Sequence, residues 1–192
     1  MRIIGGTHRG LRLTEVGVGD AAAHLRPTSD RVRESIFNLL INGKLFGGPS
    51  KNPVTGARVL DLFAGTGALG LEALSRGAAH VTLIDDGTAA QTLLRSNIDK
   101  MRAAASTTLI RANATKLPPN KAPGHSLIFL DPPYGKALGE AAIASAVAGG
   151  WLVPGAVVVW EESMAPLIPA GFGLLDQRKY GETLITILRA PE

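Results

Sequence analysis

Asp61-Leu-Phe-Ala-Gly-Thr-Gly-Ala-Leu-Gly70 is the stretch that decides the fold, because it joins an apolar run, Val59–Phe63, to a helical pattern, Leu69–Arg76. Its glycines have the spacing G-x-G-x-x-G, which permits a tight turn and close approach of a ligand to the backbone. Asp85 ends the next apolar run, about 20 residues further on, where a carboxylate can accept hydrogen bonds from both ribose hydroxyls. The stretch therefore predicts a nucleotide-type site between a strand and a helix.

Outward from this loop, apolar runs alternate with helical patterns. Further strands are predicted at Val81–Ile84, Thr107–Ile110, Leu127–Leu130, Val157–Trp160, 172–179 and 183–189, and helices at 88–103 and 137–148. Strands that alternate with helices predict an α/β fold with a mainly parallel sheet of seven strands, covered on both faces. The last two strands, joined around Gly181, predict an antiparallel edge.

The chain before the loop predicts two parts. Residues 1–26 form a short basic arm, in which Arg2-Ile-Ile4 and Leu11-Arg-Leu13 flank glycines as in a β-hairpin, and residues 27–192 form the main domain. A helix capped by Thr28 or Ser29 opens that domain and stops at Asn42-Gly43, before a loop at 47–56.

Positive charge gathers at the N-terminus. The chain carries a net charge of +4, and residues 1–33 hold six arginines against three acids. This excess suits a polyanionic partner such as RNA, although an ordinary solvated surface segment has the same composition.

A second motif, Asp131-Pro-Pro-Tyr134, follows the buried run Leu127–Leu130. In a doubly wound sheet the first and fourth strands are neighbours, so this turn and the glycine loop are expected to face one crevice. The Asp131 carboxylate and the Pro132 carbonyl can accept both hydrogens of an exocyclic base amine and so turn its lone pair toward a methyl donor. Tyr134 offers a stacking face for the extruded base, worth roughly 1–3 kcal/mol.

The identity of the nucleotide stays open on the loop alone, because its spacing also fits NAD. Asp61 stands just before the loop, where it would repel a diphosphate but attract the ammonium and sulfonium of S-adenosylmethionine. Asp86 is the second choice for the ribose contact. Asn113, after the third strand, is either an adenine ligand or a plain turn residue.

Composition excludes several other classes of site. There is no cysteine, the four histidines are scattered, and no run reaches the roughly 20 apolar residues of a membrane span. With no signal-peptide pattern either, the expectation is a cytoplasmic protein without a metal site.

Three blocks of the sequence resemble the bacterial 16S ribosomal RNA guanine-N2 methyltransferases of the RsmD type: Arg26–Asn38, Asp61–Gly77 and Asp131–Tyr134. The likeness runs from residue 2 to the C-terminal strands. It implies the Rossmann-like class I fold and S-adenosylmethionine as donor, with S-adenosylhomocysteine as product. It also implies a guanine of 16S ribosomal RNA as substrate, in an assembling or assembled 30S particle. We expect the enzyme to be a monomer.

The resemblance implies a methyl donor held by Asp61, Gly65, Gly67 and Asp85, with Asp131 and Tyr134 at the target amine. With the residues argued from the sequence itself, the expected donor site comprises Asp61, Phe63, Ala64, Gly65, Gly67, Asp85, Asp86 and Asn113. The expected catalytic turn comprises Asp131, Pro132 and Tyr134, and the expected RNA contacts comprise Arg2, Arg9, Arg12 and Arg26. Asp86-Gly87 and the long loop at 47–56 depart from the usual pattern.

Three other functions share some of these features. A DNA adenine or cytosine amino-methyltransferase has the same second motif but usually needs extra sequence to read a duplex. A catalytically silent RNA-binding assembly factor would have no use for Asp131–Tyr134, and a nicotinamide-dependent oxidoreductase would bind NAD.

Overall fold

The computed structural model describes residues 1–15, 29–48 and 51–192, and its centre is one seven-stranded sheet. The strand order is β3-β2-β1-β4-β5-β7-β6. The strands are β1 (Arg58–Leu62), β2 (His80–Ile84), β3 (Thr107–Ile110), β4 (His125–Leu130), β5 (Leu152–Glu162), β6 (Gly173–Tyr180) and β7 (Thr183–Arg189).

The sheet has the predicted mixed character. β1 lies between β2 and β4 and is parallel to both, whereas β7 is antiparallel to β5 and to β6. The first and fourth strands are therefore neighbours, as predicted, and the chain order reverses between them.

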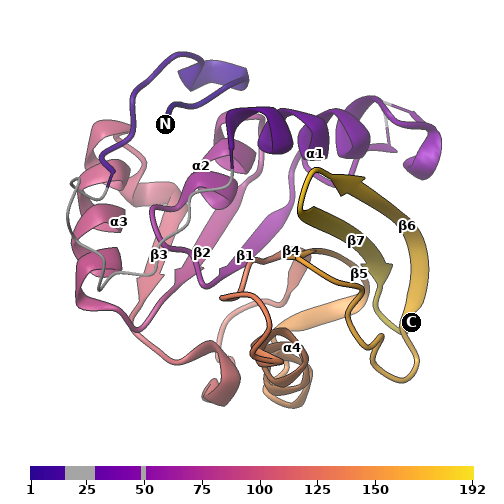
Figure 1. Ribbon diagram of the computed structural model, residues 1–192. Helices are drawn as coiled ribbons and strands as arrows, with labels where there is room; N and C mark the ends of the chain where they lie inside the picture. The colour runs from indigo at the N-terminus through magenta and orange to yellow at the C-terminus, as the bar shows by residue number, and fades with distance from the viewer. Residues whose placement is uncertain (16–28, 49–50) are drawn as a thin grey trace.

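Helices cover the two faces unequally (Figure 1). α1 (Asp30–Asn42), α2 (Ala68–Ser75) and α3 (Thr88–Lys100) lie on one face, and α4 (Leu138–Ala148) lies on the other. Side chains alternate along β1 accordingly: Val59 joins the core under the first three helices, and Leu60 joins the core under α4. Ser29 caps α1 by accepting a hydrogen bond from the Val32 amide at 3.3 Å, as one of the two predicted caps.

The N-terminal segment, defined as residues 1–15, differs from a free hairpin. Its two sides meet at a single antiparallel bridge, Arg2 to Arg12, and the chain turns through η1 (Gly6–His8). Ile3 and Leu13 are buried in the part of the core that lies under α1, α2 and α3. The predicted domain boundary between residues 26 and 27, with Arg26 and Thr28, lies outside the described residues.

Several predicted element ends were wrong: β5 extends beyond Val157–Trp160 at both ends, and α2 begins at Ala68 rather than Leu69 and ends at Ser75 rather than Arg76. Two further differences have a local reason. β1 ends at Leu62 rather than Phe63, because Phe63 has a φ of 60° and leaves the extended conformation. α3 ends at Lys100 rather than 103, because Arg102 adopts a φ of 52° and terminates the helix.

Candidate active site

The glycine loop after β1 uses its own amide groups internally. The Gly65 amide donates to Asp85 Oδ2 at 2.9 Å, and the Gly67 amide donates to the Ala64 carbonyl at 2.6 Å. The Gly70 amide, in the first turn of α2, donates to Asp61 Oδ2 at 2.8 Å. A diphosphate cradle relies on such amides being available, so this loop is poorly suited to NAD.

Asp61 is a buried carboxyl with 2% exposure. Burial raises its pKa to about 7, against the opposing effect of the Gly70 hydrogen bond, and the charge of Asp85 adds to the rise. An ionised carboxylate in such surroundings is costly unless a cation faces it. This environment favours a positively charged ligand.

Asp85 is oriented by two backbone amides. Its Oδ2 accepts from Gly65 and its Oδ1 accepts from Gly87, both at 2.9 Å, while burial raises its pKa. Asp86 is exposed, and its carbonyl accepts a hydrogen bond from Arg111 Nε at 3.2 Å. Asp85 is thus fixed beside the loop, and the Asp86 side chain faces solvent.

The remaining predicted donor residues lie in two places: Phe63 and Ala64 lead into the glycine loop, and Asn113 lies in a separate turn. Phe63 turns the chain out of β1, and the Ala64 amide donates to the Ile84 carbonyl at 3.0 Å, which ties the loop to the end of β2. Asn113 is exposed and caps η6 (Ala114–Lys116), because its Oδ1 accepts from the Thr115 amide at 2.9 Å and from the Thr115 hydroxyl at 2.7 Å. The structure therefore gives Asn113 a turn role.

The Asp131–Tyr134 turn begins beside the end of β1. Leu130 stands in register with Leu62, and the Asp131 amide donates to the Leu62 carbonyl at 3.5 Å. Pro132 is buried, and Asp131 and Tyr134 are half-buried. The glycine loop and the second motif therefore leave the sheet at the same edge, from adjacent strands.

Tyr134 is held by two C-terminal strands. Its hydroxyl donates to Glu161 Oε1 at 2.9 Å and lies 3.2 Å from Thr183 Oγ1. Burial and the neighbouring carboxylate raise the pKa of Tyr134, so its hydroxyl stays protonated. Nearby, the Gly135 amide donates to Glu162 Oε1 at 3.3 Å. These contacts fix the turn against β5 and β7.

Sequence reasoning missed these anchors. Glu161 and Glu162 end an apolar strand, and that abrupt change to acids was the available signal. Thr183 gave none, because its partner stands 49 positions away. Glu72 was also missed, although it is the only acid within the otherwise apolar and small α2.

The predicted RNA-contacting arginines lie in different surroundings. Arg2 is exposed and approaches Asp30, with Nε 3.5 Å from Oδ2. Arg9 and Arg12 are exposed, and neither forms an ion pair with another described residue. Arg26 lies outside the described ranges.

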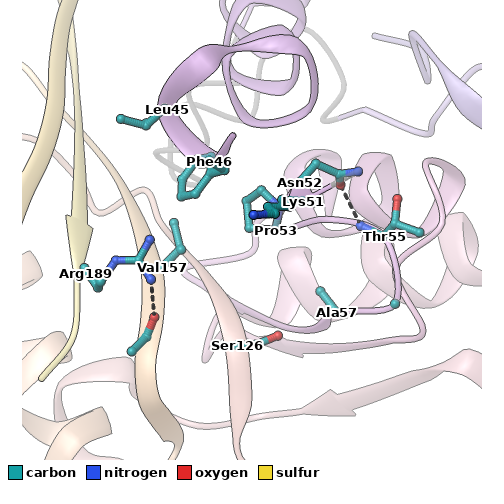
Figure 2. A pocket seen from close by; sticks show the side chains of 12 residues that line it. Leu45, Phe46, Lys51, Asn52, Pro53, Thr55, Ala57, Ser126, Val157 and Arg189 are labelled. Atoms are coloured by element: carbon teal, nitrogen blue, oxygen red, sulfur yellow. Dashed lines mark hydrogen bonds between the residues drawn. The ribbon is translucent and has the colours of Figure 1, made fainter. Parts of the chain in front are cut away.

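A separate cavity of about 480 Å³ lies at the amino ends of β1, β4 and β5, away from both motifs (Figure 2). Its wall includes Leu45, Phe46 and Arg189, and Lys51, Asn52, Pro53, Thr55 and Gly56 of the predicted loop at 47–56 line it too. Within that loop, Asn52 Oδ1 accepts from the amides of Val54 and Thr55, which confirms an irregular turn.

Across residues 1–15, 29–48 and 51–192, no group of three or more His, Cys, Asp or Glu side chains could hold a metal ion. In the same ranges no helix combines the length and the apolar character needed to cross a membrane.

A protein family described as "Conserved hypothetical protein 95" matches residues 1–189. The chain belongs to this family. A relative named ribosomal RNA small subunit methyltransferase D, from Escherichia coli K12, is 37% identical over 185 residues, which cover 95% of this chain and 86% of the relative. A relative of the same name from Haemophilus influenzae is 33% identical and covers 94% of this chain and 89% of the relative.

A solved structure is also similar to this chain. The Escherichia coli protein yhhF, described as a methyltransferase, superposes with a TM-score of 0.80 at 34% identity, over 100% of this chain and 98% of the other. The family resemblance, the fold class and the expected methyltransferase activity are therefore confirmed.

Proposed function

We propose that this methyltransferase moves a methyl group from S-adenosylmethionine to the exocyclic N2 amine of a guanine in 16S ribosomal RNA. The observation that carries the proposal is the Asp131–Tyr134 turn, tied to the end of β1 and so brought beside the glycine loop. Relatives covering nearly the whole chain bear the name of a small-subunit ribosomal RNA methyltransferase, which supports the substrate class.

The residues around the glycine loop fit the proposed donor. The Asp61 carboxyl is buried with a raised pKa, so a bound cation would favour its ionised form, and the Asp85 carboxyl is held beside the loop, where it can also accept from ribose hydroxyls. Asp85 is preferred to Asp86 for the ribose because Asp86 faces solvent. When bound, S-adenosylmethionine supplies an electrophilic methyl group on a sulfonium centre.

At the target amine, the chain's task is orientation. The lone pair of an exocyclic amine is delocalised into the ring, so the nitrogen is a poor nucleophile. The Asp131 carboxylate and the Pro132 carbonyl, aimed by two consecutive prolines, accept the two amine hydrogens and direct the lone pair. Transfer would form the N–C bond as the methyl C–S bond of the sulfonium breaks, with S-adenosylhomocysteine as the leaving group, and Asp131 would accept the proton that the nitrogen loses. Tyr134 stacks on the base as a neutral phenol.

We assign the RNA contact to the exposed Arg9 and Arg12, together with Arg2 and Arg26 of the same basic N-terminal part of the sequence. Phosphate contacts from such side chains position the substrate without reading its sequence. We further propose that the enzyme acts as a monomer on an assembling or assembled 30S particle.

The test is methyl transfer from labelled S-adenosylmethionine to 30S particles, free 16S RNA and duplex DNA, followed by mass mapping of the modified nucleotide. The proposal expects N2-methylguanine in the RNA. Transfer to DNA alone would identify a DNA amino-methyltransferase instead. Donor binding without transfer to any substrate would identify a silent assembly factor, and calorimetric binding of NAD would identify an oxidoreductase.

A further inference from the structure

Asn97, on α3, is a fully buried amide with 0% exposure that joins two distant parts of the chain. Its Oδ1 accepts from the Thr14 amide at 2.6 Å, and its Nδ2 donates to the Thr14 carbonyl at 3.2 Å. The same Nδ2 donates to the Thr66 carbonyl at 2.9 Å. One side chain therefore holds the N-terminal segment and the glycine loop together.

The Thr66 carbonyl is a sensitive point of the loop. Thr66 lies between Gly65 and Gly67, which have φ values of 55° and 78°, and glycine imposes little conformational restraint of its own. The bond from Asn97 therefore restrains a stretch whose neighbours are intrinsically free to move. Any displacement of Asn97 passes directly to the backbone of the proposed donor site.

The N-terminal segment is also bound to the helix that follows the loop. Glu72, buried on α2, accepts from the Ile4 and Gly5 amides at 2.7 and 2.8 Å. Ser75 Oγ donates to the Gly5 carbonyl at 2.6 Å. The segment is thus packed on α2 and α3 through buried polar groups, while Arg9 and Arg12 remain exposed to a partner.

We propose that Asn97 is a positioning residue that couples RNA contact by the N-terminal segment to donor binding by the glycine loop. RNA held by Arg9 and Arg12 restricts the segment, Thr14 restricts Asn97, and Asn97 restricts the Thr66 carbonyl. The donor then meets a loop that is already ordered, and by linkage the donor strengthens RNA binding by the same factor. This inference rests on the proposed function of the segment in RNA binding.

The binding test is equilibrium dialysis of the full chain with labelled S-adenosylhomocysteine, which binds without turnover, in the absence and presence of saturating 30S particles. The wild-type chain is expected to bind it at least about fivefold more tightly with particles. Asn97→Ala is expected to bring this ratio close to one. A merely structural role would weaken binding equally in both conditions and leave the ratio unchanged.

The matched control is Ser96→Ala. Ser96 Oγ lies 2.9 Å from the Thr14 hydroxyl and so also contacts the N-terminal segment, but its hydrogen bonds do not include the loop. This variant should keep the wild-type ratio. If Asn97→Ala does not fold, Asn97→Asp serves instead, because it keeps an acceptor for the Thr14 amide and loses the Nδ2 donor to the Thr66 and Thr14 carbonyls.

Hydrogen–deuterium exchange of the free protein provides a second readout. Exchange in a peptide spanning residues 61–70 should be faster in Asn97→Ala than in wild type and unchanged in Ser96→Ala. The proposal is overturned by equal exchange in the two variants, by a wild-type ratio of one, or by a ratio retained in Asn97→Ala. Failure of the chain to sediment with 30S particles would contradict the proposed function, while the exchange result would still test Asn97.

Discussion

The pKa of a single carboxyl group in the candidate site, Asp61, depends on its burial. Asp61 is buried, and its pKa of about 7 means that the folded chain holds its proton more tightly than the unfolded chain does. Stability from this proton is present at low pH and is lost as the pH rises from the ordinary value of 3.8 toward 7. Asp61 therefore costs stability in its ionised form, which is the form that the proposed donor site requires.

Asp61 gives the first prediction. The raised pKa means that the Asp61 carboxyl loses its proton between about pH 5.5 and 7.5. Over this range donor affinity should increase with pH in the wild type, because the ionised carboxylate attracts a cation. In Asp61→Asn the affinity should be weaker and nearly independent of pH. Calorimetric titration with S-adenosylmethionine at several pH values measures both profiles.

Unfolding in urea supplies the control for this prediction. Without donor, the free energy of unfolding of the wild type should fall relative to that of Asp61→Asn as the pH rises from about 4 to about 7. Parallel stability profiles for the two proteins would contradict the assigned titration of Asp61.

Asp131 gives the second prediction. Asp131→Ala removes one of the two acceptors for the target amine, so kcat should fall by about a hundredfold or more, in the range for loss of one preorganised polar contact. Binding of S-adenosylhomocysteine should survive, since the donor site lies in the other motif. Single-turnover methylation and calorimetry measure the two effects, and retained activity would refute the orienting role.

At the scale of elements, the positions of the strands followed from apolar runs and turn residues. Buried strands such as β4 leave a clear signal, because every residue of Leu127–Leu130 must be apolar when both faces are covered. The glycine loop and the Asp131 turn were found for the same reason, since each follows such a run directly.

The polar contacts between elements could not be predicted in the same way. Tyr134 meets Glu161 and Thr183 only because β7 pairs with β5, and this pairing joins residues that are 27 and 49 positions from the tyrosine. Asn97 likewise has its partners 83 and 31 positions away. The composition of a local segment therefore does not predict contacts between residues so far apart in the sequence.

The docking of the N-terminal segment on α2 gives the third prediction. A methyl group at Gly6 would lie 1.8 Å from the Ser75 carbonyl oxygen, whereas one at Gly10 would meet nothing within 4 Å. Both glycines have positive φ, 77° and 87°, so the backbone strain of alanine is similar at both sites. Gly6→Ala should therefore destabilise the protein more than Gly10→Ala does.

Thermal unfolding of the two variants provides the comparison, and limited proteolysis shows whether the segment has left α2. Gly10→Ala should lose on the order of 1 kcal/mol from backbone strain alone. Equal stability losses, with the segment equally protected, would show that its packing against Ser75 is unimportant.

For the whole molecule, two pairs of exposed basic residues stand on different parts of the chain. Arg9 and Arg12 belong to the N-terminal segment, whereas Arg178 and Lys179 belong to β6, the edge strand furthest from β3 in the sheet (Figure 1). If the first pair contacts phosphates, RNA binding releases counterions at that pair and not at the second.

This arrangement gives the fourth prediction. Arg9→Gln with Arg12→Gln should weaken binding to 16S RNA and reduce the slope of log affinity against log salt by about 1 to 2. Arg178→Gln with Lys179→Gln, which removes the same charge, should leave the slope unchanged. Filter binding over a range of salt concentrations measures the slopes, and identical slopes for the two double variants would make the N-terminal arginines ordinary surface groups.

The sheet order also has a consequence for how this enzyme is made. β7 is the last strand to be synthesised, yet it lies between β5 and β6, and its Thr183 sits against the hydroxyl of Tyr134. A nascent chain that has already produced both motifs still lacks the strand that fixes the second one. The turn at Tyr134 is therefore fixed only once β7 has been synthesised and has paired with β5.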